Sequence, residues 1–217
     1  MKKNIKGVLF DMDGVLIDSE EYICKAAITM FAEHGLKVEP DDFLPFVGAG
    51  ENRYIGGVAE KYGFTLDLER DKARTYQIYD LITQGKLKPL AGAVEFIQLC
   101  KTEGLKVAVA TSADRVKMLI NLDHIGLEES VFDTTVNGLD VERKKPFPDI
   151  YIYAAQKLGL LPEECLVVED AINGVEAAKS AGSKCLALTT SFSEQQLNQA
   201  DWIVANLAFA PVEAINW

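Results

Sequence analysis

Two aspartates, Asp11 and Asp13, stand two positions apart at the end of an apolar run, residues 5–10. Alternate residues of an extended backbone point the same way, so both carboxylates can face one site. A carboxylate can attack phosphorus, and a second carboxylate beside it can transfer protons. We interpret Asp11 as a nucleophile and Asp13 as its general acid/base; an ordinary Asp-x-Asp-Gly turn is the alternative.

The next residue, Gly14, has no Cβ. It lets the chain turn sharply and leaves room for a bound anion beside backbone N–H groups. Ser19 or Asp18 is a suitable N-cap for a helix that begins near residue 20. We therefore expect an anion-binding turn followed by a helix.

Polar pairs also follow three later apolar runs of the chain. These pairs are Thr111-Ser112 after residues 105–110, Lys144-Lys145 in the loop after 132–136, and Glu169-Asp170 after 165–168. Ligand sites of open parallel sheets lie outside the carboxyl ends of the strands. Repetition at four predicted strand ends favours one shared site over a scatter of surface charges.

Phosphoryl transfer depends mainly on positioning and on stabilisation of charge. Thr111 can donate a hydrogen bond to a phosphoryl oxygen, although it could instead only cap the next helix. Ser112 is a further candidate ligand of the substrate. Lys145 can neutralise developing charge, and we expect Lys144 to point outward.

A phosphate beside several carboxylates calls for a cation, because like charges repel. Mg²⁺ prefers carboxylate, carbonyl and phosphate oxygens. We assign Asp11 and Asp170 as its carboxylate ligands, with the carbonyl of Asp13 nearby. The role of Glu169 stays open: it could be a metal ligand, a residue that contacts the metal ligands, or an ordinary acidic residue at a strand end.

The apolar patterns along the chain predict strands that alternate with helices. Strand patterns occupy residues 5–10, 105–110, 132–136, 165–168, 184–188 and 202–204. Such alternation predicts an α/β fold, a parallel sheet with helices on both faces. Three helical patterns, near 20–34, 51–62 and 68–82, follow the first strand without a strand between them. We expect a helical insert of residues 16–88 in a core formed by residues 1–15 and 89–217.

Composition narrows the possible partners. The 217 residues carry a net charge of −11, which argues against a nucleic-acid or anionic-membrane surface. A small phosphorylated metabolite stays possible, because a metal ion and lysines can reverse the field locally. No stretch approaches the roughly 20 apolar residues of a membrane span. Four scattered cysteines indicate free thiols and favour a reducing cytoplasm; the oligomeric state stays open, with a monomer as the working expectation.

Together these motifs resemble the haloacid dehalogenase superfamily, in particular its β-phosphoglucomutase-like branch. The matching segments are Asp11-Met12-Asp13-Gly14-Val15, Ala110-Thr111-Ser112, Lys145-Pro146-x-Pro148-Asp149 and Val168-Glu169-Asp170. The resemblance implies a Rossmann-like core, Mg²⁺ dependence and an aspartyl-phosphate intermediate. It also implies that the helical insert is a small cap, which selects the substrate and excludes water.

The resemblance implies a phosphatase of a small phosphorylated metabolite, with a sugar-phosphate mutase and a non-catalytic binding module as alternatives. Candidate substrate ligands in the cap are Glu51, Asn52 and Arg53. Related mutases use a cap-loop arginine and a first-helix histidine, whose positions fall on Glu51 and Ile23 here. This difference favours hydrolysis, although Arg53 could replace the arginine if the loop register differs.

Overall fold

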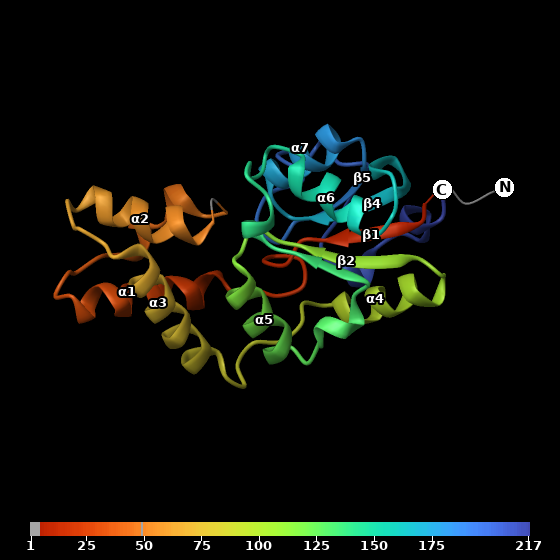
Figure 1. Cartoon of the computed structure of the whole chain (residues 1–217). Coiled ribbons are helices and arrows are strands. Elements are labelled where there is room, and N and C mark those ends of the chain that lie inside the picture. The colour runs from red at the N-terminus through yellow and green to blue at the C-terminus, as the bar shows by residue number, and fades with distance from the viewer. Residues whose placement is uncertain (1–4, 49) are drawn as a thin grey trace.

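The computed structural model describes residues 5–48 and 50–217, so residues 1–4 of the predicted core and Ala49 of the predicted cap loop lie outside the described residues. Within the described ranges, all six strands form one parallel sheet (Figure 1). The strands are β1 (Gly7–Phe10), β2 (Lys106–Ala110), β3 (Thr134–Val136), β4 (Cys165–Glu169), β5 (Lys184–Leu188) and β6 (Trp202–Val204). Their order across the sheet is β3-β2-β1-β4-β5-β6. The predicted parallel α/β fold is confirmed.

Seven α-helices accompany the sheet in the described part of the chain. They are α1 (Glu20–Glu33), α2 (Glu51–Lys61), α3 (Leu68–Thr83), α4 (Ala93–Thr102), α5 (Arg115–His124), α6 (Asp149–Lys157) and α7 (Ile172–Ala181). The bounds expected for the six strands and for α1, α2 and α3 agree with the structure to within two residues. Apolar periodicity therefore predicts these helices and strands well.

Side chains of the strands alternate between the two faces of the sheet. Val8 and Phe10 join an apolar cluster on one face, where α4 and α5 contribute Phe96 and Met118. Leu9 belongs to a second cluster, to which α6 and α7 contribute on the other face. Burial on both faces explains why the central strands have nearly continuous apolar sequences.

The helices α1, α2 and α3 and the described residues that connect them, here called the helical unit, lie beyond one end of the strands (Figure 1). The α1 helix packs against α3 and buries Ile23, Met30 and Phe31. The apolar cluster that contains these residues continues to the sheet face covered by α4 and α5. The division into domains at residues 16 and 88 stays a prediction.

Within residues 5–48 and 50–217, no helix combines the length and apolar character needed to cross a bilayer. No disulfide joins the four cysteines in the described residues, and Cys100, Cys165 and Cys185 are buried. The expectation of cysteines outside disulfides agrees with this.

Candidate active site

A cavity of about 660 Å³ lies between the carboxyl ends of the strands and the helical unit. From the core it is lined by Asp11, Asp13, Gly14, Thr111, Ser112, Lys145, Glu169 and Asp170. The helical unit contributes Ile23, Leu44 and Tyr54 to the opposite wall. The structure thus brings the predicted strand-end residues together, as expected where parallel strands end at one edge. Their chemical roles remain predictions.

The floor of the cavity holds a buried lysine between two carboxylates. The Nζ atom of Lys145 lies 2.6 Å from Oδ1 of Asp11 and 2.6 Å from Oε1 of Glu169. Burial raises the pKa of Asp11 to about 7; Lys145 opposes the rise and Glu169 adds to it. The lysine ammonium therefore stabilises the charged form of a carboxylate that burial would otherwise neutralise.

Glu169 accepts hydrogen bonds on both of its oxygens. Oε1 accepts from Lys145 and from the hydroxyl of Tyr151 at 2.7 Å. Oε2 accepts from the N–H groups of Asp170 and Ala171 at 2.8 and 3.0 Å. These four donors use the roughly four lone-pair sites of a carboxylate. The arrangement favours an orienting role for Glu169, which holds Lys145 toward Asp11.

Burial would raise the pKa of the Glu169 carboxyl group, but Lys145 and Tyr151 hold that pKa below its usual range. The side chain of Glu169 also needs space, which Gly174 leaves free. A Cβ atom on Gly174 would lie 1.8 Å from Oε1 of Glu169, so only glycine fits there. The first turn of α7 is thus shaped to admit this carboxylate.

Three buried carboxylates form an acidic cluster at the strand ends. One oxygen each of Asp11, Glu169 and Asp170 lies within 4.8 Å of the others. Burial, Glu169 and Asp11 together raise the pKa of Asp170 well above its usual value. Lys145 balances only part of this negative charge. The oxygen donors and the excess charge fit a hard divalent cation.

Gly14 makes room for the carboxylate of Asp170. Its φ is +78°, and a Cβ there would lie 1.9 Å from Oδ2 of Asp170. Its own N–H group donates to the carbonyl of Ile17 at 2.7 Å. In the structure Gly14 lines the cavity and leaves space for the Asp170 carboxylate, and its predicted part in substrate binding stays a prediction.

The β2 end presents two hydroxyl groups, Thr111 and Ser112, to the cavity. Oγ1 of Thr111 accepts the N–H of Ala113 at 3.1 Å. The α5 helix begins two residues later and takes Asp114 as its N-cap residue, so Thr111 does not cap it. Its hydroxyl hydrogen stays available to a phosphoryl oxygen. Lys144 donates instead to the carbonyl of Val141, at 3.2 Å.

Asp13 is held by Ser19, which the sequence suggested only as an N-cap, and by Lys117, which the sequence analysis did not single out. The hydroxyl of Ser19 donates to its Oδ1, and Nζ of Lys117 lies 2.8 Å from its Oδ2. Ser19 occupies the N-cap position of α1 but makes no capping hydrogen bond, contrary to the expected cap, because its hydroxyl serves Asp13. Burial would lower the pKa of Lys117, but Asp13 and Glu51 outweigh burial and raise it.

A signal for Lys117 does exist in the sequence. Along α5 the buried residues are Lys117, Met118, Asn121 and Leu122, which share one helix face. A lysine and an asparagine inside an apolar stripe are unusual unless each has a buried partner. The pattern therefore indicates that both have partners, but not which ones.

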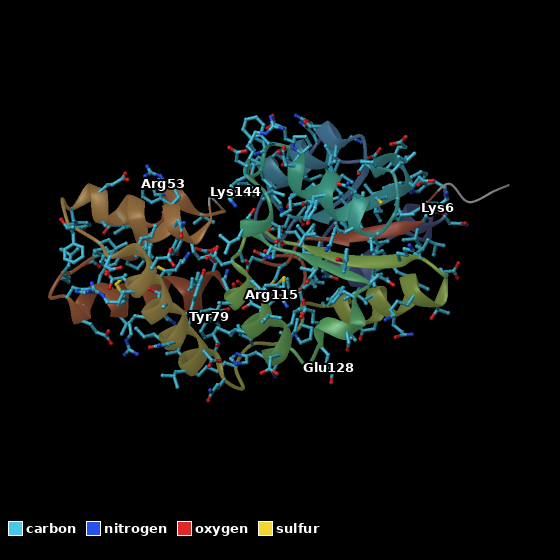
Figure 2. All side chains as sticks on the ribbon, in the orientation of Figure 1. Lys6, Arg53, Tyr79, Arg115, Glu128 and Lys144 are labelled. Atoms are coloured by element: carbon cyan, nitrogen blue, oxygen red, sulfur yellow. The ribbon has the colours of Figure 1, made fainter. Side chains whose placement is uncertain are left out.

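The start of α2 differs from what the sequence led us to expect. Glu51 lines the cavity, but Asn52 and Arg53 are not among its lining residues. Oδ1 of Asn52 accepts from Lys72 at 2.8 Å. Arg53 lies on the outer side of α2, with its guanidinium 2.7 Å from Glu60 (Figure 2). Successive residues of a helix point in different directions, so only one of the three can face the cavity.

Comparisons with known proteins agree with this geometry. The model of the haloacid dehalogenase-like hydrolase family matches residues 5–182, and the chain belongs to that family. The chain is 33% identical over 178 residues to the phosphorylated carbohydrates phosphatase of Thermotoga maritima, covering 82% of each protein. It is 45% identical over 204 residues to the chloroplastic protein SUPPRESSOR OF QUENCHING 1 of Arabidopsis thaliana. There the match covers 90% of this chain but only 19% of the relative.

Among solved structures, the CbbY protein of Rhodobacter sphaeroides in complex with phosphate has the same fold. Its TM-score is 0.86 at 24% identity, and the match covers 97% of this chain and 99% of that one. The family model confirms the predicted superfamily, and this structure confirms the predicted fold.

Proposed function

We propose that this chain is a Mg²⁺-dependent phosphatase that hydrolyses a small phosphorylated metabolite through an aspartyl-phosphate. The observation that carries the proposal is the contact of Asp11 with Lys145, 2.6 Å apart at the floor of the cavity. A buried carboxylate whose charged form is stabilised by a lysine is suited to attack phosphorus. The relative from Thermotoga maritima is named phosphorylated carbohydrates phosphatase, which supports a sugar phosphate as the class of substrate.

In the first step an oxygen of Asp11 forms a bond to phosphorus while the bond between phosphorus and the leaving oxygen breaks. Asp13 gives its proton to that leaving oxygen. Lys145 and the hydroxyls of Thr111 and Ser112 lie where they can bind the phosphoryl oxygens. These donors stabilise the charge that develops in the transition state.

In the second step water attacks phosphorus and Asp13 takes one of its protons. The bond between phosphorus and Asp11 breaks, which releases inorganic phosphate, restores the Asp11 carboxylate and leaves Asp13 protonated for the next cycle. Asp11 and Asp170 would hold the divalent cation, with the carbonyl of Asp13. When bound, the cation neutralises charge on the carboxylates and the phosphate.

The helical unit would act as the cap in this reaction. It supplies the apolar wall formed by Ile23, Leu44 and Tyr54, opposite the acidic cluster. Such a wall excludes water from the reacting groups and contacts the leaving group. Residues 16–88 are accordingly the proposed cap domain, and its wall would select the substrate. A cytoplasmic, monomeric protein remains the expectation; four cysteines that form no disulfide among the described residues support a reducing compartment.

The test is a panel of phosphorylated metabolites with release of inorganic phosphate as the readout. We expect turnover of sugar phosphates in Mg²⁺, and none by Asp11→Asn. Asp13→Asn should lose on the order of 10²–10⁴-fold, more for alkyl than for aryl phosphates, because alkyl leaving groups need the proton. Equal background rates in the wild type and Asp11→Asn would instead support a non-catalytic binding module.

A further inference from the structure

Lys117 connects the core carboxylate Asp13 to the helical unit. Its side chain extends from α5 and is 5% exposed. The Nζ atom lies 2.8 Å from Oδ2 of Asp13 and 3.8 Å from Oε1 of Glu51. Because an ammonium group has three donors, one lysine can serve both carboxylates at once. Lys117 therefore stands between the proposed proton-transfer group and the first residue of α2.

The Asp13 carboxylate is constrained from several directions. Ser19, just before α1, donates to Oδ1, and Nδ2 of Asn121 lies 3.5 Å from the same oxygen. Oδ1 of Asn121 in turn accepts from the hydroxyl of Tyr79 on α3 at 2.5 Å. The Asp13 side chain is still 31% exposed, so one side of it is open. These donors set the direction in which the open side faces the cavity.

Glu51 attaches the start of α2 to the start of α5. Its Oε2 accepts the N–H of Asp114 at 3.3 Å, while its Oε1 faces Lys117. A second buried ion pair crosses the same interface, with Nζ of Lys72 2.8 Å from Oδ2 of Asp114. The contact of Glu51 with Lys117 leads on to Asp13, whereas Lys72 pairs with the side chain of Asp114, whose N–H donates to Glu51. The contact between Glu51 and Lys117 thus makes the orientation of Lys117 depend on where the helical unit sits.

We infer that Lys117 is a positioning residue, which holds Asp13 in the orientation needed for proton transfer and is itself held by Glu51 of the helical unit. This inference rests on the proposed function, because the proton transfer it serves is that of phosphate-ester hydrolysis. The orientation of Asp13 thus depends on Lys117, and the orientation of Lys117 depends on Glu51. Closure of the helical unit would then complete the proton-transfer geometry as well as exclude water.

The first experiment compares Lys117→Met and Lys117→Arg with the wild type on an aryl and an alkyl phosphate in Mg²⁺. Lys117→Met should lower kcat for the alkyl ester on the order of ten- to hundred-fold and much less for the aryl ester, with little change in KM. This loss lies below the 10²–10⁴-fold of proton transfer itself. Lys117→Arg should restore part of the activity, because it keeps a charged donor.

A double-mutant cycle distinguishes positioning from a structural role. If Lys117 acts through Asp13, Lys117→Met should cost little further activity in an Asp13→Asn background, because the group it positions no longer transfers protons. Glu51→Gln should give a smaller loss of the same kind, and that loss should disappear in the Lys117→Met background. Losses that multiply would overturn the inference.

Lys72→Met is the matched control, because Lys72 is also buried at this interface but pairs with Asp114. We expect it to leave the ratio of alkyl to aryl rates unchanged. An equal change of this ratio in Lys72→Met would mean that any loss at the interface has the same effect, which contradicts the inference.

Two further results would also bear on the inference. If circular dichroism shows that Lys117→Met does not fold, Lys117→Arg and Glu51→Gln replace it in the test. An unchanged ratio of alkyl to aryl rates in both variants overturns the inference. A wild type that hydrolyses no phosphate ester refutes the proposed function itself. An active wild type with multiplicative losses refutes only the role of Lys117.

Discussion

The Nζ atom of Lys145 lies 2.6 Å from Oδ1 of Asp11, although 134 residues separate the two in the chain. The same ammonium lies 2.6 Å from Oε1 of Glu169. One buried lysine therefore pairs with two carboxylates of the acidic cluster, which would otherwise repel each other. Lys145 therefore contributes both to the stability of the folded chain and to the charged form of Asp11, the proposed nucleophile.

Replacing Lys145 should destabilise the fold as well as the site. Lys145→Met leaves Asp11 and Glu169 without their shared cation, and breaking a buried pair in this way costs about 3–5 kcal/mol. Urea unfolding at neutral pH in EDTA measures the change. Lys144→Met is the neighbouring control and should cost no more than about 0.5 kcal/mol. Equal losses in the two variants would contradict the assigned ion pair.

Chelation should abolish turnover, and Mg²⁺ should restore it. The acidic cluster of Asp11, Glu169 and Asp170 has more negative charge than Lys145 balances, so a cation should also stabilise the folded state. We expect added Mg²⁺ to raise Tm in the wild type and to do so far less in Asp170→Asn. Full activity in excess EDTA, with metal removal verified, would rule out the metal site.

The chain should hydrolyse phosphate esters with little mutase activity. Glu51, on which the predicted position of the mutase arginine falls, lines the cavity, and Arg53 pairs with Glu60 outside it. A carboxylate in that place repels a second phosphate group. With β-glucose 1-phosphate and a bisphosphate primer, inorganic phosphate should form ahead of glucose 6-phosphate. The opposite order would favour the mutase.

Acid should weaken the helical unit through Asp42. The ammonium of Lys61, the N–H of Glu39 and the hydroxyl of Tyr62 all donate to this carboxylate and lower its pKa to about 2. Its stabilisation is present above the unfolded pKa of 3.8 and is lost as the pH falls through about 2. Asp42→Asn should therefore cost about 1–3 kcal/mol near pH 7.

The measurement for Asp42 is the difference in unfolding free energy between the wild type and Asp42→Asn, followed from neutral pH downward. This difference should stay constant to about pH 4 and then shrink. Asp41→Asn is the control, because Asp41 is exposed beside it. A difference that grows toward low pH would contradict the assigned contacts.

The amino-acid sequence by itself determined the order of the elements and the group of residues at the strand ends. Apolar periodicity is local, so the six strands and the helices α1, α2 and α3 could be located to within two residues. Parallel strands end at one edge, which explains why Asp11, Thr111, Lys145 and Asp170 could be grouped without any coordinates.

Only the tertiary structure decided the partners of each side chain. Lys117 reaches Asp13 across 104 residues, and Glu51 faces the cavity while Arg53 faces away. Such contacts depend on the rotation of each helix about its axis and on how α2 and α3 pack against α5. Periodicity indicates which face of a helix is buried, but the neighbour on that face is set by packing between segments far apart in the chain.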